Sequence, residues 1–243
     1  MLTIFGVGGI GISNSSGLTQ TIGGPTALGG SQTWATSGSG SNLTFNGANN
    51  LAGYTLTIDA DSGTTVAVST GSGDVISGSG SAIVKDGTGT LNFVGNVANT
   101  FDGGFTLNDG TVGIRNNASL GTGTITLAGG TLTATTTNDK VIANALAITG
   151  DTTISGAASV DYQFTSNSIS NTGGSVAVVN TSGSGTVTTV GFTGSGFDLS
   201  NDFSLGDATE LRVLNTSGTQ TFSGQISGTG VVHQNAAGGT AVL

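Results

Sequence analysis

Apolar side chains recur at every second position in short segments along the whole chain. A spacing of two places the apolar side chains of a segment on one face of a β-strand. The residues between them are mostly Thr, Ser, Asn or Ala, which suit a solvated face, and no segment shows the apolar period of an amphipathic helix. We therefore predict an all-β chain. The predicted inward-facing groups are Leu43/Phe45, Leu56/Ile58, Val66/Val68, Leu91/Phe93, Phe105/Leu107, Val112/Ile114, Ile125/Leu127, Leu146/Ile148, Val160/Tyr162/Phe164, Val176/Val178, Phe203/Leu205 and Leu211/Val213.

Turn-forming sequences such as Gly-Gly, Asn-Asp-Gly and Ser-Gly-Ser-Gly separate these segments. Short strands at regular intervals fit a sandwich, a barrel or a solenoid. The pattern runs through residues 1–243 without a compositional break, and the chain has few aromatic residues for a single thick core. A solenoid needs only a narrow core stacked along its axis. We therefore predict one continuous parallel β-helix (a β-solenoid) over residues 1–243.

An internal repeat supports the solenoid. The start of a second copy is predicted at residues 226–243, and it places His233 at the position of Lys85, which we expect to face solvent. With roughly 20–25 residues in each coil, the chain would form on the order of ten coils and a rod roughly 50 Å long. The open sheet edges at its two ends would need a cap, a continuing chain or a partner. The matching segments are Ile76-Ser-Gly-Ser-Gly80 with Ile226-Ser-Gly-Thr-Gly230, Ile83-Val84-Lys85 with Val231-Val232-His233, and residues 87–91 with residues 238–243.

One region has the features of a known repeat. Residues 85–96 read Lys-Asp-Gly-Thr-Gly-Thr-Leu-Asn-Phe-Val-Gly-Asn, and residues 99–114 continue as Asn-Thr-Phe-Asp-Gly-Gly-Phe-Thr-Leu-Asn-Asp-Gly-Thr-Val-Gly-Ile. This sequence resembles the autotransporter-associated β-strand repeat, and residues 118–132 and 28–34 match its usual surroundings. The specific part of the resemblance covers about residues 76–134. It implies a right-handed parallel β-helix exported to the surface or medium of a bacterium, with a role in passenger folding, export and rod building and no active site of its own.

Composition narrows the function classes. The chain is 35% hydrophobic and 7% charged with one Pro, so it can bury a core and is unlike a disordered segment. Four basic residues against 13 acidic ones, a net charge of -9, cannot track a phosphate backbone, which argues against nucleic acid as a partner. The absence of Cys removes disulfide and thiolate chemistry.

The sequence also bears on membranes and export. No apolar run is long enough to span a bilayer. The start alternates as Leu2, Ile4 and Val7, which predicts a strand, and it lacks the basic region and cleavage site of a signal peptide. We expect any export signal to lie elsewhere.

Candidate metal sites are weak. Asp59 and Asp61 share a face at a strand-to-turn edge, where paired carboxylates either bind Ca²⁺, act as an acid/base pair or are simply solvated. The densest acidic group lacks the spacing of a calcium-roll repeat or an EF-hand, and His233, the only His, cannot form a zinc site alone. We expect no catalytic, metal or cofactor site. The acidic group consists of Asp198, Asp202, Asp207 and Glu210.

Other motifs have two interpretations each. Trp34, Phe45 and Tyr54 form either a sugar-stacking patch or part of the core. The Gly-rich segment of residues 6–11 is not a dinucleotide loop, since no helix follows it. Five Asn-x-Ser/Thr sequons are candidate glycosylation sites if the protein is exported, although stacked Asn ladders in the turns would use the same residues. The sequons begin at Asn14, Asn42, Asn117, Asn180 and Asn215.

These observations favour a non-enzymatic structural module of a secreted or cell-surface bacterial protein, a β-helical rod for fibre building or adhesion. Its expected partners are a second copy stacked end to end or the continuation of a longer chain, with surface glycans as a further candidate. The alternative is a carbohydrate-active β-helix enzyme of the lyase or hydrolase type. Such an enzyme needs carboxylates clustered with Arg or Lys on one face.

Overall fold

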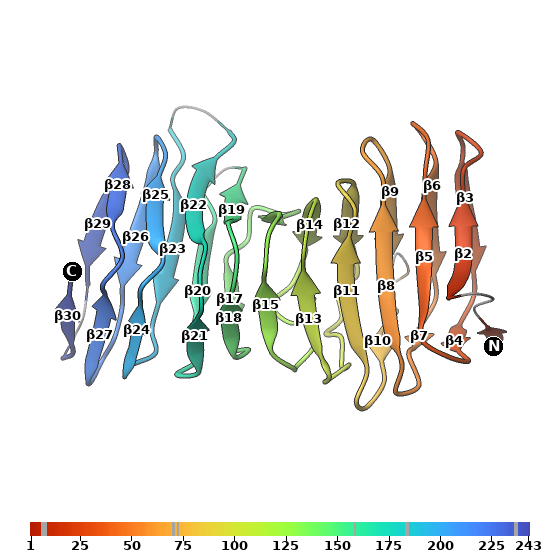
Figure 1. Cartoon of the computed structure of the whole chain (residues 1–243), viewed down its shortest axis with the longest axis horizontal. Helices are drawn as coiled ribbons and strands as arrows, with labels where there is room; N and C mark the ends of the chain where they lie inside the picture. The colour runs from red at the N-terminus through yellow and green to blue at the C-terminus, as the bar shows by residue number, and fades with distance from the viewer. Residues whose placement is uncertain (6–8, 70, 72, 158, 183–184, 236–237) are drawn as a thin grey trace. The chain divides into compact units, whose positions relative to one another are not determined.

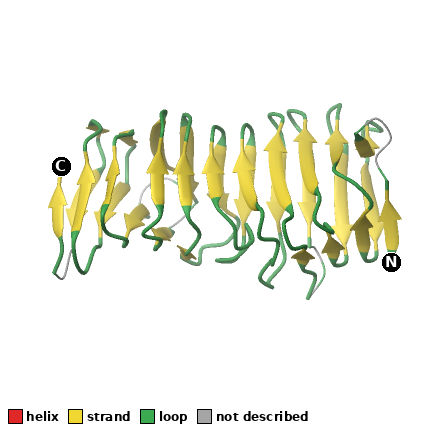
Figure 2. Cartoon of the chain, turned by 60° about the horizontal axis from the view of Figure 1, so that its bottom comes forward, coloured by secondary structure: helices red, strands yellow, loops and turns green. Residues whose placement is uncertain are grey.

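The structure, a computed structural model, describes residues 1–5, 9–69, 71, 73–157, 159–182, 185–235 and 238–243. These residues form short β-strands joined by turns and loops, with no helix among them (Figure 2). Consequently no helix of the described residues is long and apolar enough to cross a membrane. The chain divides into two compact units, residues 1–125 and 126–243, and strand β15 (Ile125–Leu127) contains the boundary.

The first unit consists of parallel strands stacked in three sheets, which the chain visits in turn from β1 to β12, after which β13 and β14 join only the second and third sheets (Figure 1). One sheet contains β1 (Leu2–Ile4), β4 (Thr26–Leu28), β7 (Asn49–Asn50) and β10 (Ile76–Ser77). The next contains β2 (Ile10–Asn14), β5 (Gln32–Thr36), β8 (Thr55–Ala60), β11 (Ala82–Asp86) and β13 (Gly104–Leu107). The third contains β3 (Thr19–Gly23), β6 (Asn42–Asn46), β9 (Thr65–Val68), β12 (Thr90–Phe93) and β14 (Thr111–Ile114).

The in-register pairing aligns like residues into columns. Leu43, Val66, Leu91 and Val112 lie on successive strands at equivalent positions, and all four are buried. In each column, inward-facing apolar side chains of neighbouring strands lie one above the other. A shift of one residue in the pairing of a strand would turn its apolar side chains toward solvent. Strand register in this unit is therefore set by the apolar period of two.

The second unit uses the same construction. One group of paired strands contains β16 (Thr131–Ala134), β19 (Thr152–Gly156), β22 (Ser175–Asn180), β25 (Asp202–Leu205) and β28 (Ile226–Gly228). A second contains β17 (Lys140–Ile142), β20 (Asp161–Phe164), β23 (Thr188–Phe192), β26 (Thr209–Val213) and β29 (Val231–Gln234). Two further groups pair β18 (Leu146–Ile148) with β21 (Ile169–Asn171), and β24 (Phe197–Leu199) with β27 (Thr219–Phe222) and β30 (Thr240–Val242).

A cluster of five phenylalanines fills the interior of the second unit. Phe192 lies at the centre, with its ring centroid 5.5 Å from that of Phe164 in a stacked arrangement and 5.9 Å from that of Phe222 edge to face. Such pairs add to the stability gained from burial alone. The sparse aromatic residues predict a thin core, but they do not predict that five of the Phe side chains gather in one place. The other two members are Phe197 and Phe203.

Glycines at the corners allow neighbouring coils to approach closely. Gly47 has a φ of 137°, and a Cβ there would lie 2.5 Å from the carbonyl carbon of Gly24 on the adjacent coil. Gly87 has a φ of 72°, and its Cβ would lie 2.4 Å from the carbonyl oxygen of Ala60. A side chain at either position would force the stacked corners apart.

The prediction of an all-β solenoid is confirmed, with about 10 turns in the two units together. Every inward-facing side chain predicted from the period of two is buried. The strand predicted at the start is confirmed as β1, while Val7 lies outside the described residues. Right-handed winding stays a prediction.

Candidate functional site

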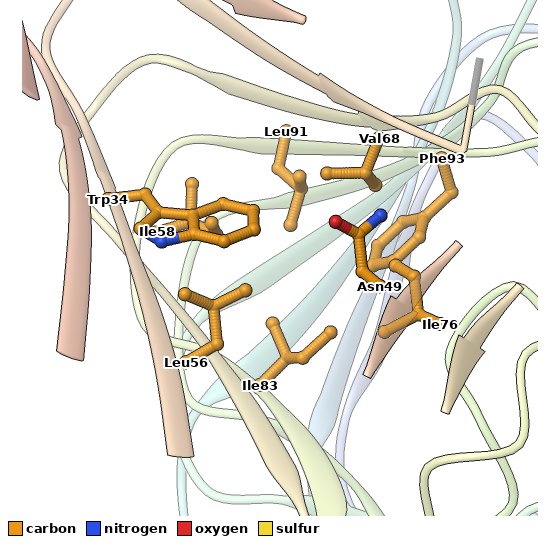
Figure 3. Close-up of a pocket in the computed structure, with 9 residues that line it drawn as sticks. All are labelled: Trp34, Asn49, Leu56, Ile58, Val68, Ile76, Ile83, Leu91 and Phe93. Carbon is orange, nitrogen blue, oxygen red and sulfur yellow. The ribbon is translucent and has the colours of Figure 1, made fainter. Parts of the chain in front are cut away.

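The interior of the first unit contains a packed apolar space, not a ligand cavity. Side chains from all three sheets converge on it, with Trp34 on one side and Phe93 on the other (Figure 3). The space has an accessible volume of about 0 Å³ and cannot hold a water molecule. The polar group that enters it, Asn49, is satisfied internally: its Oδ1 accepts a hydrogen bond from Thr26 Oγ1 at 2.5 Å, and its Nδ2 donates to the Gly47 carbonyl at 3.0 Å.

The aromatic residues near the start of the chain belong to this core. Trp34 and Phe45 are both buried and stack with ring centroids 3.9 Å apart and an interplanar angle of 12°. Tyr54 alone is exposed, at 38%. A sugar-stacking patch of all three residues is therefore wrong, and the core interpretation holds for Trp34 and Phe45.

The structure shows that Lys85 does not face solvent, contrary to the prediction from the internal repeat. Its side chain is buried, and its Nζ donates hydrogen bonds to the carbonyls of Asp86 and Gly87, each at 2.6 Å, and of Asp109 at 3.3 Å. Burial lowers the pKa of Lys85 to about 8, although the nearby carboxylates of Asp109, Asp59 and Asp86 act in the opposite direction. The lysine therefore joins the corners of two adjacent coils by hydrogen bonds from the interior.

His233 does face solvent, but not because it matches Lys85. In β11 the inward residues are Ile83 and Lys85, whereas in β29 the inward residue is Val232, which pairs with the buried Leu211. The two copies are thus offset by one residue with respect to the strand faces. Because side chains alternate between faces, that offset turns His233 outward.

Asp59 and Asp61 both lie exposed at the end of β8, as predicted. Asp59 pairs in register with Asp86 of the next strand, and Asp86 accepts a hydrogen bond from Asn108 Nδ2 at 2.7 Å. The main chain of Asp61 closes the turn, since its carbonyl accepts the Thr64 hydroxyl at 2.7 Å. Among the described residues no three Asp, Glu, His or Cys side chains are grouped closely enough to hold a metal ion.

The acidic group of residues 198–210 does not converge on one point. Asp198 accepts a hydrogen bond from the Ser223 hydroxyl at 2.7 Å, and Asp202 accepts the Gln225 main-chain N–H at 2.8 Å. Asp207 accepts the hydroxyl of Thr229. These three aspartates therefore each form a hydrogen bond to the next coil. Of the four acidic residues, Glu210 is the one that belongs to a cluster of charged side chains.

That cluster lies on the outer face of the sheet that contains β20, β23 and β26. Arg212 places its Nη2 2.8 Å from Glu210 Oε2 on the same strand and its Nη1 3.1 Å from Asp161 Oδ2. The Nδ1 of His233 lies 2.8 Å from the other Glu210 oxygen. Since β23 lies between β20 and β26, the Arg212 side chain crosses a whole coil to reach Asp161.

Gly191 makes that crossing feasible. It pairs in register with Arg212, and a Cβ at this position would lie 2.8 Å from Leu214 Cδ1 and 3.5 Å from Arg212 Cβ. A larger side chain on β23 would stand between Arg212 and Asp161. The sequence shows a Gly inside a strand here, which is a known sign of close approach by another group.

A polar hollow adjoins the cluster. It has a volume of about 390 Å³, within the range of small-molecule sites. The Oδ1 of Asp139 accepts a hydrogen bond from the Asp161 N–H at 3.0 Å. The hollow brings two carboxylates and a guanidinium together from residues far apart in the sequence, and the sequence gives no local motif for it. Its lining consists of Asp139, Ser159, Val160, Asp161, Val187, Thr189 and Arg212.

The two carboxyls bound to Arg212 have opposite pKa shifts. Burial raises the pKa of Asp161, outweighing the hydrogen bond from Gln163 and the charge of Arg212. Burial acts on Glu210 in the same direction, but hydrogen bonds from Arg212 and His233 bring the pKa of Glu210 below its usual value. Asp161 is thus the carboxyl that takes up a proton more readily.

The sequon asparagines differ in exposure. Asn14 and Asn215 are buried, and their Nδ2 groups donate to main-chain carbonyls, including Leu18 at 2.8 Å and Gly218 at 3.0 Å. Asn117 is exposed, while Asn42 and Asn180 are partly buried. A glycan on Asn14 or Asn215 would have to replace these hydrogen bonds, so glycosylation stays a prediction that Asn117 accommodates best.

No protein-family model, curated protein or solved structure matches the chain. The resemblance to the autotransporter-associated β-strand repeat therefore rests on its sequence motifs and on the β-solenoid fold alone. The Gly-rich segment of residues 6–11 includes residues 6–8, which lie outside the described part of the chain.

Proposed function

We propose that the chain is a non-enzymatic structural module of a secreted or cell-surface bacterial protein, a β-helical rod that builds fibres or mediates adhesion. The single observation that supports this most strongly is that polar side chains are used to join coil to coil. Asn99, which is buried, accepts the Ile76 N–H at 2.9 Å and donates to the Ser119 carbonyl at 2.7 Å, so one amide joins three successive coils. Residues used in this way stiffen a scaffold and are not available for chemistry.

The outermost strands support assembly at the ends. Among the strands that the structure describes, each strand of the first coil (β1 to β3) and of the last coil (β28 to β30) pairs with one other strand only. Residues 1–58 contain no charged side chain, and residues 213–243 contain none except His233. Natural sheet edges are usually protected by charges. Unprotected edges suit a further coil, supplied by a second copy or by the rest of a longer protein.

The exposed apolar side chains have the same distribution. Leu2, Ile10 and Leu18 in the first coil are 54–66% exposed, and Val231 and Val242 in the last coil are 63% and 46% exposed. A further coil stacked on either end would cover part of this surface. In the isolated chain only a second copy can supply that coil, so self-association end to end is the expected behaviour.

The flat outer face of the first unit is suited to adhesion. Thr65, Thr90 and Thr111 lie in register on successive strands and point outward. Regularly spaced hydroxyls on a β-sheet can meet a polar partner over a long contact without a pocket. Placement outside the cell is part of the same proposal, and it is supported by the repeat resemblance of residues 76–134.

The test introduces a charge at the edge. Val242→Lys places an ammonium group on the outermost strand, and Thr219→Lys places one at an exposed position of the neighbouring strand as the control. Sedimentation velocity should show concentration-dependent association of the unmodified chain and of Thr219→Lys, and its loss in Val242→Lys. A chain that stays monomeric at every concentration would refute the assembly part of the proposal.

A second candidate function is carbohydrate-active catalysis, which the hollow beside Arg212 favours. Asp139 and Asp161 line it together with Arg212, and the pKa values of Asp161 and Glu210 are shifted in opposite directions. Release of reducing ends or unsaturated products from a panel of polysaccharides, abolished by Asp161→Asn, would establish this function in place of the structural one.

A further inference from the structure

The hollow beside Arg212 has an excess of negative charge. Its surroundings contain three carboxylates, Asp139, Asp161 and Glu210, and one guanidinium that already contacts Asp161 and Glu210. The nearby Lys140 points into the core, where its Nζ donates to the Thr136 hydroxyl at 3.1 Å and to the Asn138 carbonyl. Among the described residues Asp139 forms no direct ion pair, although its charge interacts with those of Lys140 and Arg212, so its carboxylate oxygens stay open to a positively charged ligand.

Asp161 adds a second negative charge beside the hollow, which a cation would offset through space and not by contact with the buried Oδ1. Its Oδ1 is buried and has no hydrogen-bond donor within the described residues, while its Oδ2 is bound by Arg212 and Gln163. Burial without a donor penalises the charged carboxylate, in agreement with the raised pKa of Asp161. A cation bound in the hollow would offset part of that penalty.

The rest of the lining suits a ligand that also carries hydroxyls. Ser159 and Thr189 can both donate and accept hydrogen bonds, and the exposed Val187 provides a small apolar wall. None of the described lining residues is aromatic, so a ligand held mainly by ring stacking does not fit. Resting on the adhesive part of the proposed function, we propose that the hollow binds a primary ammonium group on a hydroxylated ring, that is, a protonated amino sugar.

The ligand series separates charge from hydroxyl recognition. NMR titrations of the isotope-labelled chain would compare D-glucosamine, its neutral N-acetyl form, D-glucose and the diamine cadaverine, with the amines protonated. The inference predicts saturable shifts at Asp161 and Thr189 with glucosamine, and weaker binding of the other three. Equal binding of glucose and glucosamine, equal binding of cadaverine and glucosamine, or no saturable binding would overturn it.

Two variants distinguish binding in the hollow from non-specific attraction of the amine to the negatively charged chain. Asp139→Asn keeps an acceptor for the Asp161 N–H and removes one charge, and Asp202→Asn removes an exposed charge elsewhere in the same unit. Asp139→Asn should weaken glucosamine binding roughly tenfold, as expected for losing a hydrogen bond to a charged group, and Asp202→Asn should not. Equal affinities in the two variants would contradict the inference. End-to-end assembly is measured separately by sedimentation, so failure here leaves the structural part of the proposed function standing.

Discussion

Two of the four basic side chains, Lys85 and Lys140, point into the coils and reach corner carbonyls from inside. The sequence contains the signal for both of them. Lys85 follows Ile83 by two residues and Lys140 precedes Ile142 by two, so the period that buries each isoleucine also buries the lysine. The charge of Lys85 alone suggested exposure. A long aliphatic stem lets a lysine occupy an inward position when its ammonium group finds acceptors at the edge of the core.

Lys85 should make stability depend on pH. Because the folded pKa of Lys85, about 8, lies below the ordinary 10.5, the unfolded chain binds a proton between these values that the folded chain does not. The free energy of unfolding should therefore rise with pH in this window, relative to Lys85→Met. Denaturant titrations of both proteins at several pH values test this. Parallel pH profiles of the two proteins would show that Lys85 is not buried as described.

The Asn99 side chain should contribute strongly to the stability of the first unit. Asn99→Ala leaves the buried Ile76 N–H and Ser119 carbonyl without their partners, at a cost of about 2 kcal/mol or more. The adjacent exposed Thr100→Ala is the matched control and should change the free energy of unfolding by less than about 0.5 kcal/mol. Similar losses in the two variants, measured by chemical denaturation, would argue against coil joining by Asn99.

At the scale of the strand, the apolar period of two predicted the inward faces correctly, as the buried columns of Leu43 and Leu91 show. The repeat match near residue 231 predicted the inward positions less well, because similarity of sequence does not determine which face of the strand a residue occupies. Leu211 fixes it instead, because it stacks on Val232. The hollow could not be predicted at all. Its residues come from β20, β23 and β26 and from the segments before β17, β20 and β23, and only the pairing of strands brings them together.

Gly191 should be needed for the Arg212 crossing. Gly191→Val places methyl groups against Leu214 and should cost about 1–3 kcal/mol through overpacking. By displacing Arg212, it should also raise the pKa of Asp161 further, because the guanidinium holds that pKa down. NMR titration of the Asp161 carboxyl measures this, with Leu214→Ala in the same background to relieve the steric part. An unchanged Asp161 pKa in Gly191→Val would mean that Arg212 reaches Asp161 by another path.

At the scale of the molecule, fold class was readable from the sequence because a solenoid repeats one local rule in every coil. Function is less readable for the same reason. The corner amides and carboxylates form hydrogen bonds to neighbouring coils, as Asn99 and Asp202 do. Their abundance in the sequence is therefore explained by the fold and does not indicate a ligand site. What distinguishes a scaffold from an enzyme here is the behaviour of the coil edges and of the hollow beside Arg212.

The most direct test of the central claim is cryo-electron microscopy of the isolated chain over a range of concentrations. We predict filaments in which one copy stacks on the next, with the coil spacing of about 4.8 Å continuing across each junction from β28–β30 to β1–β3. Particles that remain single at all concentrations, or that pack side by side with the coil edges uncovered, would contradict it.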